Sequence, residues 1–362
     1  MKVLDLFCGC GGLSLGFEQA GFTIYGGVDF NQSAIDTYHK NFPNSKAICF
    51  DLLNMSKNEI AKQFPDLDSV DVIIGGPPCQ GFSSANRYQK EGKDPRNKLF
   101  FQFVKFVDIV LPKAIVIENV KGIITKDNGY ALKRITAIFE KRGYSVVHKI
   151  LKATDFGVPQ RRSRNFFVML KNSEGVFDFD SMNKTNEVIT VKEAIGELYQ
   201  FEKGYKKNKS PLFLVEPAIT NFQKYLRSSD NSLYNHEIRY PAQKVQNRIS
   251  YVKQGENWES VPEDLWPSQR TNRQSSAYKR LDENKPSVTI DTGNNHSNYF
   301  HPLFNRIPSV REAARLQSFP DSFLVLGNRS EQFRQVGNAV PPLLAKALAI
   351  AIMEKIGHEN QN

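Results

Sequence analysis

The sequence predicts an α/β protein in which a doubly wound, mostly parallel sheet carries an inserted, smaller and irregular domain. Short apolar runs alternate with segments of helical periodicity as far as Leu170. From Lys171 to about Phe304 the chain is rich in Asn, Lys, Ser, Gln and Tyr, and the periodicity fades. A helical pattern then returns near the C-terminus. The length of 362 residues is enough for one large domain or two.

In the first half of the chain, apolar runs and segments of helical periodicity predict the strands and helices one after another. Apolar runs predict strands at Val3–Phe7, Thr23–Val28, Lys46–Phe50, Val70–Ile74, Ala114–Ile117, Ser145–Leu151 and Arg164–Leu170. Helical periodicity predicts helices at Ser14–Ala20, Ser33–Lys40, Lys57–Phe64, Leu99–Val110 and Tyr130–Lys141. Strands that alternate with helices in this way favour parallel pairing.

The C-terminal pattern predicts that the chain returns to its first domain. Helices are expected at Val191–Tyr199, which would close that domain, at Ser309–Gln317 and at Pro341–Ile356. The last has Pro-Pro at its first turn and too little polar surface to stand alone, so it should pack on the sheet domain. We therefore expect a first domain at 1–200, an inserted domain at 201–330 and a returning segment at 331–362.

Composition narrows the class of protein. The net charge of +10 suggests a polyanionic partner such as nucleic acid, although a merely basic enzyme would show the same charge. No apolar stretch reaches the roughly 18 residues needed to span a membrane, and Asp5 lies where a signal peptide has its apolar centre. The four cysteines are few, and Cys8-Gly9-Cys10 is spaced too tightly for a usual zinc half-site. We expect a cytoplasmic protein without a membrane segment, a disulfide framework or a bound metal.

The segment from Gly75 to Ser83 places a cysteine at a rigid turn. It follows the apolar run Val70–Ile74, and its two glycines and two prolines fix the chain just before Cys79. A lone cysteine is most often a small buried residue. A thiol held at the mouth of a sheet is, however, placed as a nucleophile would be. Glu118 ends another strand, and ligands bind outside the carboxyl ends of parallel strands. A thiol and an acid are therefore predicted to face one substrate.

The ends of the first three strands favour an adenosine ligand. The glycine-rich segment Asp5–Gly12 would let the backbone approach a ligand closely, but Ser14 stands where a dinucleotide fingerprint needs glycine, which disfavours a nicotinamide oxidoreductase. Asp29 could bind ribose hydroxyls, Asp51 an adenine amino group, and Phe7 could stack. Singly, Phe7 could be a core residue and Asp51 a helix cap. Together they suit an adenosine ligand without a diphosphate, such as S-adenosylmethionine.

Six segments, in order, give the chain a resemblance to a family. The sequence resembles the bacterial DNA (cytosine-5)-methyltransferases of the restriction–modification type over most of its length, and the resemblance implies their S-adenosylmethionine-dependent methyltransferase fold. Cys8 departs from the family pattern, which usually has Ala or Ser there. The segments that carry the resemblance are Asp5–Gly12, Gly76–Ser83, Glu118–Val120, Gln160–Arg164, Arg311–Asp321 and Gln335–Pro341.

The resemblance implies a role for each catalytic candidate. Cys79 would attack C6 of cytosine as a thiolate and so make C5 nucleophilic. Glu118 would donate a proton at N3, provided that burial lets it hold one. Arg164 would stabilise the charge at O2, with Arg162 in support, although both arginines could instead bind phosphate or form structural ion pairs. The base that removes the C5 proton is an ordered water or a side chain.

The resemblance also implies the cofactor and its contacts. S-adenosylmethionine would be converted to S-adenosylhomocysteine, without a metal. The residues carried over for its site are Phe7, Gly9, Gly11, Asp29, Asp51, Pro78, Leu99 and Asn338.

Access to the C6 face of a paired cytosine requires the base to be flipped out of the duplex. The basic, glycine-containing segment Gln80–Lys98 is predicted to close over DNA as a lid, with Ser83 and Arg87 at the backbone, although it could be an ordinary solvated loop. The inserted domain would read the sequence, since Arg, Asn and Gln make bidentate contacts to purine edges. The candidates there are Gln269, Arg270, Asn272 and Arg273. Pro286–Ile290 resembles the Thr-plus-aliphatic element of the family, which implies that Thr289 positions the backbone of the flipped nucleotide.

The expected partner is double-stranded DNA. We expect a monomer with a functional link to a restriction endonuclease, without a stable complex. One alternative is a tRNA cytosine-5 methyltransferase, but such relatives have a much reduced recognition domain. Another is a non-catalytic DNA-binding regulator, but Cys79, Glu118 and Arg164 are all present.

Overall fold

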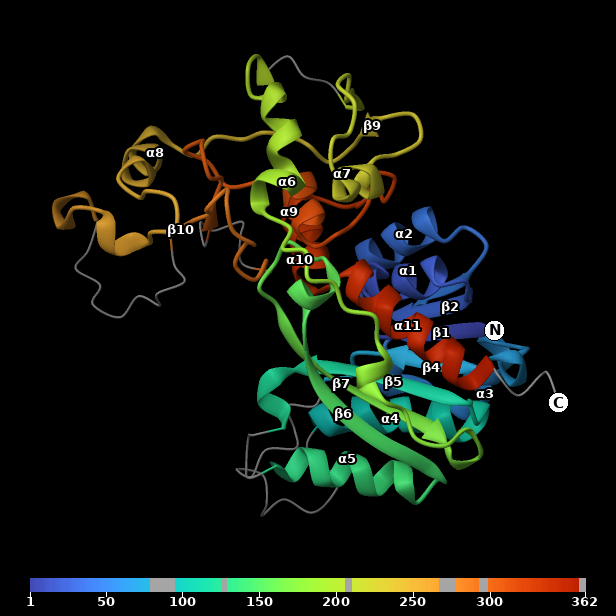
Figure 1. Ribbon diagram of the computed structural model, residues 1–362. Coiled ribbons are helices and arrows are strands. Elements are labelled where there is room, and N and C mark those ends of the chain that lie inside the picture. The colour runs from blue at the N-terminus through green and yellow to red at the C-terminus, as the bar shows by residue number, and fades with distance from the viewer. Residues whose placement is uncertain (79–94, 125–128, 206–209, 267–277, 293–298, 358–362) are drawn as a thin grey trace. The chain divides into compact units, whose positions relative to one another are not determined.

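The computed structural model describes residues 1–78, 95–124, 129–205, 210–266, 278–292 and 299–357 (Figure 1). Contacts divide the chain into two compact units. The sheet unit comprises Met1–Phe156, Ser163–Lys184 and Pro342–Asn362, and the second unit comprises Gly157–Arg162 and Thr185–Pro341. These bounds differ from the predicted cuts after residues 200 and 330, because 185–200 and 331–341 pack with the second unit.

The sheet unit is built on one seven-stranded sheet with the strand order β3-β2-β1-β4-β5-β7-β6. The first five strands pair in parallel, and β7 runs antiparallel to both β5 and β6. This confirms the predicted doubly wound, mostly parallel sheet. The strands are β1 (Lys2–Leu6), β2 (Thr23–Asp29), β3 (Lys46–Cys49), β4 (Val72–Gly75), β5 (Ala114–Val120), β6 (Tyr144–Lys152) and β7 (Ser163–Lys171).

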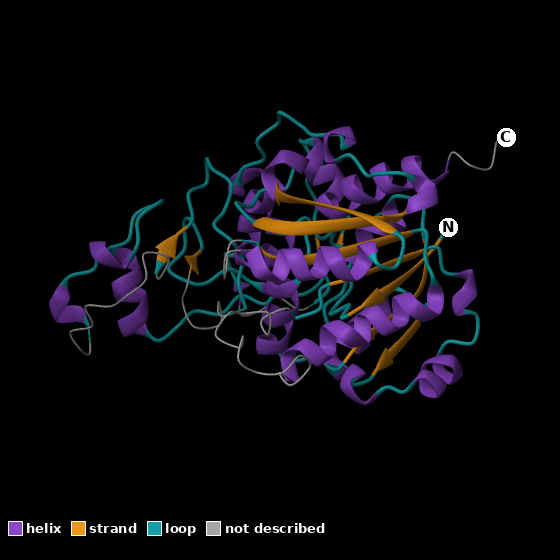
Figure 2. Ribbon diagram, turned by 90° about the horizontal axis from the view of Figure 1, so that it is seen from below, coloured by secondary structure: helices purple, strands orange, loops and turns teal. Residues whose placement is uncertain are grey.

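Helices cover both faces of this sheet (Figures 1 and 2). On one face lie α1 (Gly12–Gln19), α2 (Gln32–Asn41) and α11 (Pro342–Gly357); on the other lie α3 (Lys57–Gln63), α4 (Pro95–Val110) and α5 (Tyr130–Glu140). Helix α11 packs closely on α1, since a Cβ on Gly16 would lie 2.3 Å from the Cβ of Ala345. By length and composition the stretch Arg329–Gly357 could cross a membrane, but 67% of its most apolar window is buried in the protein, as in a core helix.

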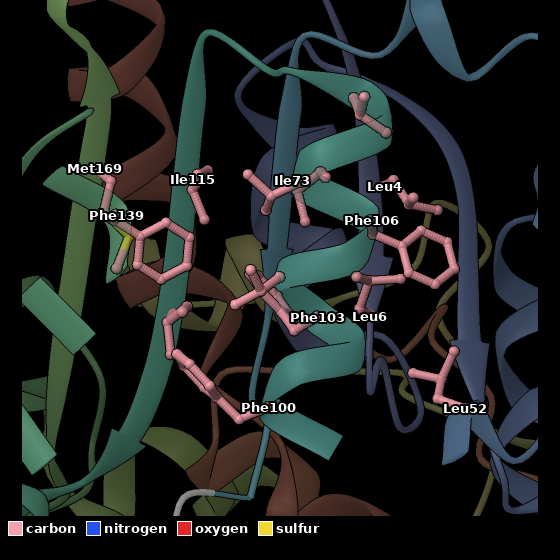
Figure 3. Close-up of a cluster of buried hydrophobic side chains, with 14 of the residues drawn as sticks. Leu4, Leu6, Leu52, Ile73, Phe100, Phe103, Phe106, Ile115, Phe139 and Met169 are labelled. Atoms are coloured by element: carbon pink, nitrogen blue, oxygen red, sulfur yellow. The ribbon is translucent and has the colours of Figure 1, made fainter. Parts of the chain in front are cut away.

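The α4 face of the sheet holds a large apolar core. Leu4, Ile73 and Ile115 are paired across β1, β4 and β5, so their side chains share this face. They meet the aromatic side of α4, where Phe103 and Phe106 are fully buried (Figure 3). The alternate residues, among them Asp5 and Glu118, therefore belong to the opposite face of the sheet.

The second unit has short elements, and its described strands form two-stranded pairs. The predicted helix at 191–199 is observed as a short α-helix followed by a 3₁₀ turn at Gly196–Phe201, and it belongs to this unit rather than closing the first domain. The α-helices are α6 (Val191–Ile195), α7 (Asn221–Leu226), α8 (Gln243–Ser250), α9 (Val310–Leu316) and α10 (Arg329–Asn338), and the strands are β8 (Leu212–Phe213), β9 (Ser232–Leu233), β10 (Lys279–Arg280) and β11 (Tyr299–Phe300).

Buried charges organise the second unit around α9. Arg306 donates to both oxygens of Glu312 at 2.8 and 3.0 Å, and both side chains are fully buried. Although burial alone would raise it, the Arg306 guanidinium holds the pKa of Glu312 well below its usual range. One turn later Arg315 makes a bidentate pair with Asp321 and also pairs with Glu197. Each of these groups is charged and hydrogen-bonded, as a buried ion must be.

Candidate active site

The reversed direction of β7 brings an acid and a cation together at the edge of the sheet. Glu118 lies near the end of β5 and Arg164 near the start of β7, where Arg164 pairs with Val120. Residues two apart on a strand share a face, so Arg164 is a diagonal neighbour of Glu118. Arg164 Nε lies 3.0 Å from Glu118 Oε1, and the side chains are 21% and 15% exposed. This pair is accessible to a ligand yet well shielded from bulk water.

The segment that leads to Cys79 begins beside this pair. Glu118 Oε2 lies 3.4 Å from the position that a Cβ on Gly76 would occupy. Asn119 Nδ2 donates to the Pro77 carbonyl at 3.1 Å, which fixes the turn after β4 to the end of β5. Pro78 is half-buried. Cys79 itself lies outside the described residues. Gly76, three residues before it, follows the end of β4 next to the Glu118 carboxyl.

The loop between β1 and α1 is shaped for close backbone approach. Phe7 has φ 62°, a strained conformation for a side chain of this size, and it is half-buried against the core. Gly9 also has a positive φ of 53°, and nothing lies within 4 Å of the position that its Cβ would take. Gly11, at φ 93°, packs so tightly that a Cβ would lie 2.5 Å from the ring of Phe42. The loop thus leaves open space at Gly9 while it is packed from behind at Gly11.

Asp29, at the end of β2, ties this loop to the next one. Its carboxylate accepts the Gly9 N–H and the Asn31 N–H, both at 2.9 Å. Burial raises the pKa of Asp29 above its ordinary value, and the backbone donors oppose this rise. Phe30, which follows it, is 75% exposed. The sequence analysis missed Phe30; the signal available was an aromatic residue directly after the acid at a strand end.

Two further residues of the predicted cofactor site have structural contacts of their own. Asp51 is exposed and caps the 3₁₀ turn Leu52–Asn54, accepting the Leu53 N–H at 3.0 Å. Leu99, on α4, is half-buried and packs against the core. The strand-end set nevertheless fits an adenosine-type ligand, because an open glycine backbone, a carboxylate and an exposed aromatic ring follow neighbouring strands. A diphosphate would need a third glycine at Ser14, whose side chain is instead buried.

The remaining predicted residues that are described belong to the second unit. Arg162 is 2% exposed, and its guanidinium donates to the carbonyls of Gly337 at 2.9 Å and of Ile290 and Asn338 at 3.3 Å. Thr289 donates its hydroxyl to the Arg161 carbonyl at 2.8 Å. Arg162 therefore orders backbone around it, whereas Arg164 of the sheet unit is bonded to a carboxylate.

Nearly the whole sequence matches one family model. The model for C-5 cytosine-specific DNA methylases matches residues 1–354. The chain belongs to this family. The methylase is therefore an enzyme that transfers a methyl group to C5 of cytosine in DNA, and membership implies S-adenosylmethionine as the methyl donor. Because the family acts on DNA, the alternatives of a tRNA enzyme and of a non-catalytic regulator are not favoured.

Individual relatives agree with this membership. The type II methyltransferase M1.HphI of Haemophilus parahaemolyticus is 40% identical over 98% of this chain and 87% of its own. M.DdeI of Desulfomicrobium norvegicum is 37% identical over 96% of this chain and 88% of its own. Among solved structures, a prophage-encoded E. coli protein described as a DNA modification methyltransferase has a TM-score of 0.78 at 27% identity, covering 99% of this chain and 100% of that one.

Several predicted residues of the methylase lie outside the described part of the chain. These are the nucleophile candidate and the candidates for DNA contact in the loop after it and in the second unit: Cys79, Ser83, Arg87, Gln269, Arg270, Asn272 and Arg273.

Proposed function

We propose that the methylase carries out its reaction with Cys79 as the nucleophile, Glu118 as the proton donor and Arg164 as the permanent cation. One observation supports this assignment above the others. The Glu118 carboxyl is held by Arg164 at 3.0 Å and lies beside Gly76, three residues before Cys79. These contacts support the proposal because the acid and the cation lie where β5 ends and β7 begins, beside the segment after β4 that leads to Cys79.

Each group meets a charge that develops in the cytosine ring. The Cys79 thiolate forms a bond to C6, and the electron pair displaced from the C5–C6 double bond makes C5 nucleophilic. Glu118 gives its proton to N3 as the ring gains electrons. Arg164 can bridge Glu118 and the ring oxygen O2, because its guanidinium has several donors in a fixed plane. Once C5 has received the methyl group, N3 returns its proton to Glu118, and loss of the C5 proton to a base expels Cys79 as the thiolate and restores the aromatic ring.

Arg162 is assigned a positioning role in the second unit. Its bonds to the carbonyls of Ile290, Gly337 and Asn338 leave it buried, so we assign it to holding these segments in place rather than to touching the base. Close packing reinforces this arrangement, since a Cβ on Gly337 would lie 2.5 Å from the backbone of Asp291. Thr289 would then be positioned to contact the flipped nucleotide.

The cofactor site is assigned to the ends of β1, β2 and β3. Asp29 would accept the ribose hydroxyls, Asp51 would meet the adenine amino group, and the rings of Phe7 and Phe30 would enclose the adenine. Gly9 and Gly11 would let the backbone approach the ligand, and Pro78, Leu99 and Asn338 would complete the site. When bound there, S-adenosylmethionine supplies the methyl group and leaves as S-adenosylhomocysteine.

The second unit is assigned to target recognition. We infer that Gln269, Arg270 and Arg273 read base edges and that Ser83 and Arg87 meet the DNA backbone. The relatives named type II methyltransferases favour a role in protecting host DNA from a cognate restriction endonuclease. The enzyme would act in the bacterial cytoplasm at the nucleoid, as a monomer without a stable complex with that nuclease.

Two measurements test the proposal. Bisulfite sequencing of DNA from a strain that expresses the methylase should show 5-methylcytosine at one position of one short motif. A duplex with 5-fluorocytosine at that position should then form a stable adduct through Cys79, because fluorine at C5 cannot be removed as a proton. The Cys79→Ser variant should form no adduct yet still bind S-adenosylmethionine. An adduct through another residue would exclude the assignment.

A further inference from the structure

A buried acid lies directly behind the glycine-rich loop, and the reaction described above does not use it. Asp5, on β1, is 1% exposed and accepts the Ser14 hydroxyl at 2.6 Å. Ser14 Oγ is in turn 2.8 Å from the Tyr38 hydroxyl, and both partners are fully buried. The three side chains join β1, α1 and α2 into one hydrogen-bonded chain. Only one member of this chain, Asp5, can be ionised near neutral pH.

The position of Asp5 sets what its charge can act on. It precedes Phe7 by two residues, so the strand end where a ligand would bind is about 7 Å away at about 3.3 Å per residue. Its neighbours across the sheet are Gly27 and Ile74, which carry no charge. A carboxylate in such surroundings is poorly screened, and it will favour a cation bound at the loop over a neutral group.

We propose that the ionised carboxyl of Asp5 makes the cofactor site of the methylase prefer the sulfonium of S-adenosylmethionine to the thioether of S-adenosylhomocysteine. This inference rests on the proposed cofactor site. Substrate and product share the adenosine, the amino group and the carboxylate, and differ at sulfur by one methyl group and one positive charge. A negative charge on Asp5, directly behind the loop that would hold this ligand, would therefore separate the two ligands and ease release of the product.

The groups around Asp5 bring the pKa of its carboxyl close to neutral pH. Burial raises the pKa of Asp5 to about 7, with Asp29 adding to the rise and Ser14 opposing it. Burial also raises the pKa of Cys10 to about 12 and those of Cys8 and Tyr38 well above their ordinary values, so these groups stay neutral. Asp29 is another acid that faces the loop, and the charge of Glu18 adds to the rise in the pKa of Tyr38. The preference for the sulfonium should therefore grow as pH rises from 6 to 8.

The test is the ratio of the two dissociation constants, measured by calorimetry on the full chain at pH 6, 7 and 8. In the wild type, the preference for S-adenosylmethionine over S-adenosylhomocysteine should rise with pH by about tenfold, as expected for a unit charge at this range. Asp5→Asn, which keeps the shape of the side chain, should lose that preference at pH 8 and make the ratio independent of pH, while affinity for S-adenosylhomocysteine changes little.

A second variant guards against a merely structural effect. Ser14→Ala keeps the charge but removes a donor to it, so the rise of the ratio should move to higher pH rather than disappear. Equal weakening of both ligands in Asp5→Asn, or a wild-type ratio that does not change with pH, would overturn the inference while leaving the cofactor site intact. If the folded wild type binds neither ligand, the proposed cofactor site itself is wrong.

Discussion

The two units of the methylase place their charges in opposite ways. In the sheet unit the α4 face carries an apolar core, and the charged pair Glu118–Arg164 lies partly exposed at the strand ends. In the second unit the interior itself is ionic, and the side chains of Arg306, Arg315, Glu312 and Asp321 are fully buried. The charged pair of the sheet unit thus lies where a ligand could reach it, whereas the charged pairs of the second unit form part of its interior.

This difference has an energetic meaning. Apolar packing is non-directional and tolerates small adjustments, whereas a buried ion requires its partner at one distance and one angle. Removal of a single member leaves the other charge unpaired in a medium of low polarity, which is costly. We therefore expect the sheet unit to lose activity, and the second unit to lose stability, when one charge is removed.

The largest effect is expected on catalysis in the sheet unit. Glu118→Gln keeps the size of the side chain but cannot supply a proton, so kcat should fall by about 10²- to 10⁴-fold. Affinity for S-adenosylmethionine and the thermal midpoint should stay close to those of the wild type. Methyl transfer from labelled cofactor to duplex DNA measures the loss.

A matched change provides the control for this variant. Glu331→Gln alters a half-buried capping residue of α10, where glutamine also serves. Its turnover should equal that of the wild type. If Glu118→Gln kept more than a tenth of wild-type turnover, Glu118 could not be the proton donor.

The next largest effect is expected on the free energy of unfolding, when a buried charge of the second unit is removed. Arg315→Met removes the bidentate partner of Asp321, which keeps only the more distant Arg311 at 3.8 Å, while Glu197 keeps Arg227. It should lower the free energy of unfolding by about 3 kcal/mol. Arg142→Met breaks a similar Arg–Asp pair on the sheet unit, with Asp108, whose side chains are 33% and 41% exposed. That loss should stay within about 1 kcal/mol. Urea unfolding of both variants makes the comparison, and equal losses would contradict it.

The smallest expected effect is a difference in unfolding free energy between two helix-cap variants of the same type. Ser309 and Ser56 each begin a helix with a reciprocal capping box, to Glu312 and Glu59 respectively. Ser309 is fully buried and also hydrogen-bonds His236 Nδ1 at 2.8 Å, whereas Ser56 is exposed. Ser309→Ala should cost about 2 kcal/mol, at the upper end for such caps. Ser56→Ala should lower the free energy of unfolding by less. Chemical denaturation of both variants measures the two losses. A larger loss for Ser56→Ala would contradict the inference that burial strengthens the cap.

The sheet unit could be predicted from the sequence because its pattern is local. Each strand and helix in the first half was expected within a few residues of its observed bounds, since apolar periodicity directly reports which face is buried. The antiparallel direction of β7 was not expected, because periodicity carries no information on strand direction. Without that direction, the contact of Arg164 with Glu118 could only be inferred from family resemblance.

The second unit could not be predicted in the same way. Its order depends on polar contacts between residues far apart in the sequence, such as Arg306 with Glu202 and Arg315 with Glu197. A charged residue in a sequence looks the same whether it will be buried or solvated, and the expectation for 201–330 was an irregular domain. Helix α10, which begins at a well-formed asparagine cap, was missed for lack of an apolar stripe.

The reversed strand β7 has a consequence for the position of Arg164. Arg164 is held by backbone ladders on both sides, opposite Val120 of β5 and Leu151 of β6. Its location is thus fixed by the sheet and does not depend on the path taken by residues 157–162 before the strand begins. A change in the path of that segment should therefore leave the distance between Arg164 and Glu118 unaltered.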